Sequence, residues 1–319
     1  MADPRDISAH GALTRRSVLQ WGTVAAISAC AWPLPFVARA NALGQLSVAG
    51  RTLSVLSDGA MSLPLSFLLP DQPRGEAEAL FAKHDMVADP LTPDCNVTLL
   101  RDGGRAALFD AGAGPGFMST TGRLQESLKA ADIDPASITD VIFTHAHPDH
   151  LWGVVDDFDE LVFPNAVYRI AQAEWDFWRA DDTLEKMPDA RKNFVIGAQN
   201  RFAAIEEKIV LFRPGDEVFP QVEAVDTAGH TPGHVSFAVH GGDDSMMVLG
   251  DAIANVVVSF ERPDWRFGSD HDPDRGVVTR RALLDRLAGE GARIVGFHLP
   301  HPGIGRVERA GTAYRFVAA

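Results

Sequence analysis

The 319-residue sequence predicts an α/β (α+β) protein in which two β-sheets pack against each other and helices flank them. Short apolar or alternating runs, which indicate strands, occur in two clusters, and segments with helical spacing lie between them. A hydrophobic content of 46% is enough for one large core or two fused layers. Because no Pro-, Gly- or Ser-rich linker divides residues 41–319, we expect them to form one domain.

The first cluster opens with a hairpin, because residues 46–56 alternate in polarity around Ala49-Gly50. A second turn is expected at Gly103-Gly104, between two predicted strands. The further elements expected in this half are strands 96–100, 106–109 and 141–143 and helices 121–131, 173–178 and 191–207. Residues 63–93 are Pro-rich at both ends, and we expect this segment to cross over the active site.

The second cluster contains predicted strands at 222–225, 235–239, 246–249 and 293–297. A helix is expected over residues 273–288, because Pro273 stands directly after Asp272 and proline is favoured in a first helical turn. In both clusters, strands end next to histidine or aspartate. Ligand-binding loops gather at such strand ends, where a rigid scaffold positions them.

A His-x-His-x-Asp-His motif directly follows the apolar strand 141–143. Polar groups at the end of a buried strand need partners, and a divalent metal ion satisfies imidazole and carboxylate groups together. His145 and His147 alternate along the chain and therefore point the same way if the chain is extended. Asp149 and His150 come after a proline that redirects the chain. The motif thus predicts two adjacent ligand sets rather than one.

Further candidate ligands lie at the ends of other predicted strands. His234 precedes strand 235–239, Asp251 follows strand 246–249, and His298 follows strand 293–297. Nearby, His230 and His301 are open to three interpretations: metal ligands, partners of ligands, or ordinary turn residues. Partners of this kind are expected, because a ligating histidine usually donates from its other ring nitrogen.

These residues, in this order, resemble the metallo-β-lactamase superfamily of hydrolases. The resemblance implies an αββα sandwich of two mixed sheets flanked by helices, with two divalent metal ions at one edge. It also implies that one metal is held by His145, His147 and His234, and the other by Asp149, His150 and His298. Asp251 and a hydroxide would bridge the metals, which makes Asp149 and Asp251 the catalytic carboxylates. We expect zinc, with manganese, cobalt and iron as alternatives.

Strings over nearly the whole chain after residue 40 are similar to the methyl parathion hydrolase-like branch of this superfamily. The Gly-His-Thr-Pro-Gly-His string favours His234 over His230 as a ligand, and the His-Leu-Pro string favours His298 over His301. The resemblance also implies an aromatic substrate pocket. Its expected residues are Phe117, Trp152, Trp178 and Phe194.

The expected function is hydrolysis of neutral esters or phosphotriesters with hydrophobic leaving groups, by a metal-bridging hydroxide. One alternative is a quorum-quenching acyl-homoserine lactonase, although such lactonases usually carry tyrosine three residues after the bridging aspartate, where this chain has Ala254. Another alternative is a β-lactamase. A non-catalytic binding protein would be expected to have lost ligands, and all seven are present here.

The first forty residues resemble a twin-arginine signal peptide, so we divide the chain into a signal at 1–40 and a hydrolase domain at 41–319. Arg15-Arg16 precedes an apolar stretch, and Ala38-Arg39-Ala40 is typical of a cleavage site. The expected location is periplasmic or secreted, without stable membrane insertion after cleavage. The alternative is a lipid anchor at Cys30.

Charge and cysteine content limit the partners. The formal net charge is −14, which argues against nucleic acid, whose phosphates need a basic surface. A small-molecule substrate is therefore expected. Beyond residue 40, Cys95 is the one cysteine, so that part of the chain can form no internal disulfide. Relatives in the branch are often dimers, which makes a homodimer an expectation.

Overall fold

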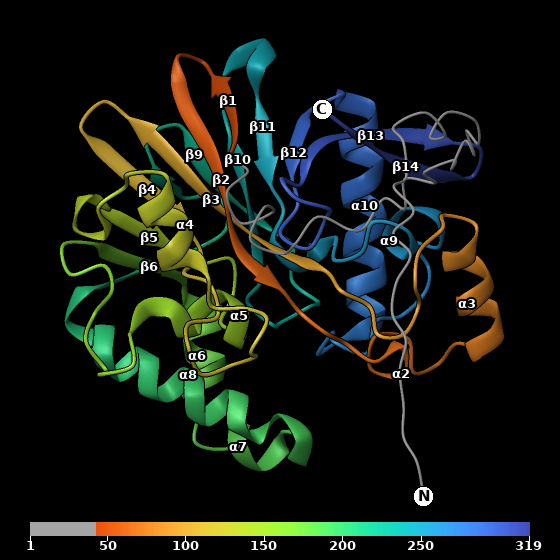
Figure 1. Cartoon of the computed structure of the whole chain (residues 1–319), viewed down its shortest axis with the longest axis horizontal. Helices are drawn as coiled ribbons and strands as arrows, with labels where there is room; N and C mark the ends of the chain where they lie inside the picture. Colours follow the sequence, from red (N-terminus) through yellow and green to blue (C-terminus); the bar gives the residue numbers. More distant parts are fainter. Residues whose placement is uncertain (1–42) are drawn as a thin grey trace, which may run out of the picture. The chain divides into compact units, whose positions relative to one another are not determined.

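Two seven-stranded β-sheets form the framework of the protein (Figure 1). The computed structural model describes residues 43–319. The strand orders are β1-β2-β3-β4-β5-β6-β7 and β14-β13-β12-β11-β10-β9-β8. The predicted fold class, two mixed sheets flanked by helices, is confirmed. The predicted signal at residues 1–40, with Cys30, lies outside the described residues.

The first sheet combines antiparallel and parallel pairing. Strands β1 to β4 pair antiparallel, and β4 to β7 pair parallel. The strands are β1 (Gly44–Val48), β2 (Arg51–Ala60), β3 (Asp94–Asp102), β4 (Arg105–Phe109), β5 (Asp140–Ile142), β6 (Val167–Ala171) and β7 (Ile209–Phe212). The predicted hairpin at Ala49-Gly50 is confirmed, since Val48 pairs with Arg51.

The second sheet is antiparallel except between β11 and β12, which run parallel. Its strands are β8 (Glu217–Phe219), β9 (Val222–Asp226), β10 (Val235–Val239), β11 (Met246–Val248), β12 (Arg293–Val295), β13 (Ile304–Ala310) and β14 (Ala313–Ala318). The predicted strand 293–297 is shorter in the structure, because the chain turns at Gly296 instead of continuing to His298.

The two sheets enclose a common apolar layer. In β4, Ala107 and Phe109 face this layer, whereas Leu108 belongs to the cluster on the outer face of the sheet. Phe237 of β10 meets Phe109 across the layer, with ring centroids 5.2 Å apart. Successive side chains of a strand point to opposite faces, so each central strand contributes to two cores. This double burial holds the strand ends rigidly.

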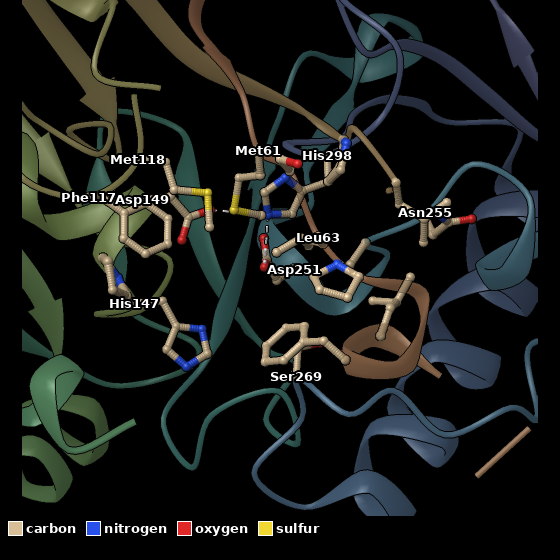
Figure 2. Close-up of a pocket in the computed structure, with 18 of the residues that line it drawn as sticks. Met61, Leu63, Phe117, Met118, His147, Asp149, Asp251, Asn255, Ser269 and His298 are labelled. Carbon is tan, nitrogen blue, oxygen red and sulfur yellow. Dashed lines mark ion pairs between the residues drawn. The ribbon is translucent and has the colours of Figure 1, made fainter. Parts of the chain in front are cut away.

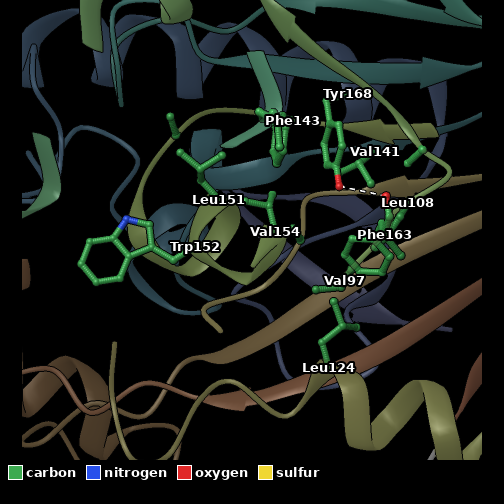
Figure 3. Close-up of a cluster of buried hydrophobic side chains, with 14 of the residues drawn as sticks. Val97, Leu108, Leu124, Val141, Phe143, Leu151, Trp152, Val154, Phe163 and Tyr168 are labelled. Atoms are coloured by element: carbon green, nitrogen blue, oxygen red, sulfur yellow. Dashed lines mark hydrogen bonds between the residues drawn. The ribbon is translucent and has the colours of Figure 1, made fainter. Parts of the chain in front are cut away.

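Helices cover the outer face of each sheet. On the first sheet they are α4 (Leu124–Ala130), α5 (Pro148–Leu151), α6 (Gln172–Arg179), α7 (Thr183–Lys186) and α8 (Lys192–Ile205). Their apolar side chains pack with those of the strands (Figure 3), where the Tyr168 hydroxyl also donates to the Phe163 carbonyl at 3.0 Å. On the second sheet, α9 (Val258–Glu261) and α10 (Pro273–Glu290) contribute to a separate cluster.

The segment between β2 and β3 leaves the sheets. It contains α2 (Leu65–Leu68) and α3 (Arg74–Ala82), and its apolar residues pack against residues between Ala254 and Phe267. This segment corresponds to the predicted excursion 63–93. Within residues 43–319, no helix has the length and apolar character needed to cross a membrane.

Candidate metal centre

The His-x-His-x-Asp-His motif occupies the turn after β5 and the first turn of α5. Proline begins α5, which places Asp149 and His150 in its first turn while His145 and His147 remain in the preceding loop. All four side chains are buried, and the ring of His145 is fully inaccessible to solvent. The strand end therefore concentrates four potential metal ligands in the protein interior, as the sequence predicts.

Three imidazole rings converge on one side of the centre. His147 Nδ1 lies 3.0 Å from His145 Nε2 and 2.9 Å from His230 Nε2. These three residues form a group whose ligand atoms all lie within 4.8 Å of one another. We call His145, His147 and His230 the three-histidine half of the site.

His234 does not join this group, contrary to the expectation from the sequence. Both of its ring nitrogens already have partners: Nδ1 lies 2.9 Å from Thr227 Oγ1, and Nε2 accepts from the Asp251 backbone N–H at 2.9 Å. Its ring thus connects the loops after β9 and β11. Three residues separate the two histidines, and the turn that they form directs His230 to the ligand position instead, so we replace His234 by His230 in the candidate set.

Asp149, His150 and His298 form the second half of the site, which we call the carboxylate half. His298 Nε2 lies 3.2 Å from Asp149 Oδ2, and His150 Nε2 lies 3.4 Å from the same oxygen. Asp251 stands between the two halves. Its carboxylate oxygens lie 3.2 Å from the Nε2 atoms of His150 and His298 and 3.3 Å from His230 Nε2.

In His150, His230 and His298, the ring nitrogen that points away from the centre contacts an acceptor. Nδ1 of His150 lies 2.8 Å from Asp110, Nδ1 of His230 lies 2.9 Å from Asp270, and Nδ1 of His298 lies 2.9 Å from the Asp94 carbonyl. A neutral imidazole that donates from Nδ1 keeps a lone pair on Nε2. In the neutral rings, these lone pairs would face carboxylate oxygens, an arrangement that a cation between them stabilises.

Unsatisfied atoms test whether the site fits divalent metals. Asp149 Oδ2, His150 Nε2 and Asp251 Oδ1 are buried and, apart from the ion-pair contacts given above, have no hydrogen-bond partner within the described residues. Such orphaned atoms are costly in a folded protein unless an ion or ligand meets them. Imidazole nitrogens and carboxylate oxygens are the donors that zinc and related ions take. The donor set therefore fits divalent metal ions.

The protonation states of His145, His147 and the two ligand carboxylates agree with this role. Burial and the neighbouring imidazoles of His150 and His230 hold the pKa values of His145 and His147 well below the usual value, so both rings are neutral at physiological pH. Burial opposes ionisation of Asp149 and Asp251, but the adjacent histidines outweigh it and lower both carboxyl pKa values. Neutral imidazole and ionised carboxylate are the forms that bind metals. At His150 and His298, burial lowers the pKa but the neighbouring carboxylates outweigh it and raise the pKa, so metal binding there would release a proton.

Two buried carboxylates outside the ligand set connect the loops. Glu174 of α6 accepts from the Ala146 backbone N–H at 2.9 Å and from the Gly233 N–H at 3.0 Å, and so ties the two histidine-bearing loops together. Asp110 accepts from the Thr144 backbone N–H at 2.8 Å as well as contacting His150. Sequence reasoning missed the roles of Asp110 and Glu174, since neither of these two residues lies within the His-x-His-x-Asp-His motif.

Asp270 and His271 are further residues that sequence reasoning missed. Asp270 contacts His230, and His271 Nε2 lies 3.2 Å from His147 Nε2. Burial, followed by the nearby His230 and Arg191, lowers the pKa of His271 to about 3. The one signal available in the sequence was an Asp-His pair immediately before a predicted helix.

His301 and Cys95 border the site. Nδ1 of His301 lies 2.7 Å from Asn96 Oδ1, and its backbone N–H donates to Asp94 at 2.9 Å, so this histidine supports the loop that follows β12. Cys95 is buried, and its sulfur lies within 4.8 Å of ligand atoms of Asp149 and His298.

A largely apolar pocket of about 330 Å³ opens over the centre. His147, Asp149 and Asp251 lie at its floor together with His230 and His298. In Figure 2, the side chains of Asp149, Asp251 and His298 meet near the middle of the view. Other lining residues come from outside the motif: Met61, Ser62, Leu63, Pro64, Phe67, Leu68, Leu91, Pro93, Met118, Arg191, Ala254, Asn255 and Ser269. The excursion between β2 and β3 thus forms much of the wall.

The four predicted aromatic residues divide into two groups. Phe117 and Phe194 line the pocket, with ring centroids 6.1 Å apart. Trp152 stands behind Phe117 at 5.9 Å, and Trp178 is fully buried, where its indole N–H donates to Glu174 at 2.6 Å. Neither tryptophan lines the pocket, because each ring is used in the core beneath it.

Comparisons with known proteins agree with this site. The family model described as the metallo-β-lactamase superfamily matches residues 92–298. The solved structure of AidC, a dizinc quorum-quenching lactonase in complex with a product, is 28% identical, with a TM-score of 0.82 over 87% of this chain and 97% of that chain. The hydrolase AbOPH, of the β-lactamase superfamily, is 27% identical, with a TM-score of 0.81 over the same shares.

A curated relative extends the comparison. The N-acyl homoserine lactonase AttM of Azorhizobium caulinodans is 26% identical over 183 residues, which cover 54% of this chain and 62% of the relative. The family match includes the motif after β5 and ends at His298, so it contains every candidate ligand. The chain belongs to the metallo-β-lactamase superfamily and is one of its metal-dependent hydrolases.

Proposed function

We propose that this protein hydrolyses uncharged esters, among them lactones, carboxylic esters and phosphotriesters, that carry a hydrophobic group. One observation carries the proposal: a buried histidine and aspartate cluster forms the floor of a largely apolar pocket. Such a pocket binds the hydrophobic part of a substrate and presents its polar bond to the cluster.

The candidate ligands divide between two divalent ions. His145, His147 and His230 would hold one, Asp149, His150 and His298 the other, and Asp251 would contact both. When bound, two such ions activate water as a nucleophile and stabilise the negative charge that develops on the substrate oxygen. We propose zinc, because the related AidC is a dizinc enzyme and this donor set suits it.

The chain itself contributes orientation and exclusion of water. The carboxylates of Asp149 and Asp251 are ionised at the pocket floor, where they can accept a hydrogen bond from a polar group of the reacting species. Apolar side chains such as Phe117 and Leu63 surround that floor. Electrostatic interactions strengthen when water is excluded around them.

The pocket favours uncharged substrates because Arg191, the basic residue of its wall, already donates hydrogen bonds to the backbone. Arg191 lines the pocket, but its guanidinium donates to the backbone carbonyls of Gly268 and Ser269. The polar residues Ser62, Asn255 and Ser269 are the remaining uncharged hydrogen-bonding side chains of the lining. An anionic substrate would therefore have only the metals to balance its negative charge.

Two relatives favour the lactone arm of the proposal, since AidC and AttM are both lactonases. The resemblance to the methyl parathion hydrolase-like branch favours the phosphotriester arm. Ala254 lines the pocket and carries no hydroxyl, so this position cannot donate a hydrogen bond to a lactone. A lactonase reaction in this protein would use other donors, such as the side chains of Ser62 or Asn255.

The test is hydrolysis by the purified protein of an aryl phosphotriester, an aryl ester and a long-chain homoserine lactone, with metal content measured on the same sample. Asp251→Asn removes a carboxylate at the pocket floor, and Glu308→Gln is its control, because Glu308 pairs with Arg315 on the exposed β13–β14 hairpin and does not line the pocket. We expect close to two metals per chain and turnover of at least one substrate. Absence of metal after reconstitution, or two metals without turnover of any of the three, would overturn the proposal.

A further inference from the structure

Asp270 and His271, two consecutive residues before α10, each contact a different histidine of the three-histidine half. Asp270 Oδ1 lies 2.9 Å from His230 Nδ1, and His271 Nε2 lies 3.2 Å from His147 Nε2. His147 and His230 come from different loops, one after β5 and one before β10. One dipeptide therefore reaches both loops from a third part of the chain.

The backbone holds this dipeptide against the His230 loop. The His271 N–H donates to the His230 carbonyl at 2.9 Å, and the Asp272 N–H donates to the Gly229 carbonyl at 3.0 Å. Asp272 also caps α10, because its side chain accepts from the Arg275 N–H. The start of a long helix thus fixes the position of Asp270 and His271.

Asp270 is a buried carboxylate with two fixed partners. Its second oxygen accepts from Arg280 of α10 at 3.2 Å, and its side chain is only 2% exposed. A side chain at Gly276 would come within 2.4 Å of this carboxylate, so glycine is required there for the close approach. An ionised carboxylate can only accept, so His230 must donate from Nδ1 and keep its Nε2 lone pair for a metal.

His147 needs a partner at a different ring nitrogen from His230, because the candidate ligand nitrogen of His147 is Nδ1 and that of His230 is Nε2. That atom faces His145 Nε2 and His230 Nε2, and the proton of a neutral ring must then lie on Nε2. The partner of Nε2 in the structure is Nε2 of His271. His271 can accept there only as a neutral ring with its own proton on Nδ1. The contact between the two rings therefore selects one tautomer of each.

Packing keeps the His271 ring in this position. Its centroid lies 5.3 Å from that of Phe177 and 5.6 Å from that of Trp178, both on α6. On its other side it borders a second cavity of about 790 Å³, separate in its lining from the pocket floor. A side chain of similar volume without an acceptor should fit the same space.

We propose that Asp270 and His271 are positioning residues that set the metal affinity of the three-histidine half, by holding His230 and His147 in their ligand tautomers. The inference rests on the proposed dinuclear site and assigns a role to residues outside the ligand motif. Partners of this kind usually affect metal affinity about 10- to 100-fold. Since they contact only His147 and His230 among the ligands, the effect should be confined to one of the two metals.

The experiment compares His271→Leu, His271→Gln, Asp270→Leu and Asp270→Asn in the full chain with His240→Gln as a control. His240 lies outside the site, where it pairs with Glu223 and is 52% exposed. Zinc is removed by a competing chelator, and the two dissociation constants are measured. We expect His271→Leu and Asp270→Leu to weaken one constant about 10- to 100-fold and leave the other near wild type. His271→Gln and Asp270→Asn should recover most of the affinity, because an amide oxygen can accept the hydrogen bond.

Two further measurements separate positioning from folding. Thermal unfolding of the metal-free His271 variants should match that of the metal-free wild type, and ¹⁵N NMR of zinc-loaded protein should show the His147 proton on Nε2. The Asp270 variants should unfold at a lower temperature, because Arg280 loses its buried carboxylate partner, so the His271 variants separate positioning from folding. If wild type binds two metals and His271→Leu binds each of them with the wild-type affinity, the inference fails and the proposed function stands. If wild type binds no metal, both fail. Proton occupancy of His147 Nδ1 in the loaded protein would also overturn the inference.

Discussion

The floor of the pocket comes from loops at the ends of β5, β11 and β12 and from the turn before β10, whereas its wall comes from segments outside the two sheets. Strands that end at the floor are buried on both faces, between the sheets and beneath the helices. The wall includes residues 61–68, 117–118 and 254–255, which lie in connections. The ligands are therefore anchored by the framework of the two sheets. The shape of the binding space depends instead on connecting segments, whose sequence can change without moving the ligands.

The two regions also differ in how they are held. Buried carboxylates such as Asp110 and Glu174 hold the ligand-bearing loops at the floor by accepting from backbone N–H groups. The wall is held by apolar packing between the excursion after β2 and the segment before α10. Polar networks depend strongly on geometry, whereas apolar contacts tolerate changes of similar volume. Substitutions at the floor should therefore abolish function, and those at the wall should redirect it.

The largest effect is expected for Asp251→Asn at the floor. This carboxylate contacts Nε2 atoms from both halves of the site, and the amide removes the negative charge that they share. We expect loss of the two-metal stoichiometry and a fall in kcat/KM beyond the roughly 10- to 100-fold typical of outer partners. Metal analysis and kinetics on one sample would check this. A variant with two tightly bound metals and wild-type turnover would disprove the role of Asp251.

A second, smaller effect distinguishes the two histidines of one turn. His230→Ala should reduce bound metal from two ions per chain to one, because His230 Nε2 faces the three-histidine half. His234→Ala should keep both ions but lower the free energy of unfolding by about 1–3 kcal/mol, since it leaves the Asp251 N–H and Thr227 hydroxyl without this partner. Metal analysis and chemical denaturation measure the two quantities. The opposite pattern of metal loss would restore His234 as the ligand.

The smallest effect is expected at the wall. Phe117→Ala should raise KM for an aryl substrate about 10-fold, because an aromatic contact worth about 1.4 kcal/mol is lost. Metal content should not change, since Phe117 lines the pocket without bonding to a ligand. Phe158→Ala is the matched control, because its side chain is 83% exposed and away from the pocket lining. An unchanged KM would remove Phe117 from the substrate site.

Secondary structure could be predicted best where periodicity and turn residues agree. The β1–β2 hairpin and α10 lie close to their expected positions. The hairpin of β13 and β14 and the parallel strands β6 and β7 were not anticipated. In β14 only Tyr314 is buried and the other residues are partly or fully exposed, so the sequence shows little apolar pattern. The predicted helix 121–131 begins later, at Leu124, because Asp58 accepts from the backbone N–H groups of Gly122 and Leu124 and fixes the preceding turn.

Of the candidate ligands, the sequence by itself located the motif after β5, Asp251 and His298, because each stands where a strand ends and polar groups need partners. The choice of His298 over His301 came from the family resemblance. Only the tertiary structure decided between His230 and His234, since the direction of each ring depends on contacts with Thr227, Asp251 and His147. It also decided the partners of the ligands. His147 and His271 are 124 positions apart, and a contact at that separation depends on how distant loops pack, which local patterns do not encode.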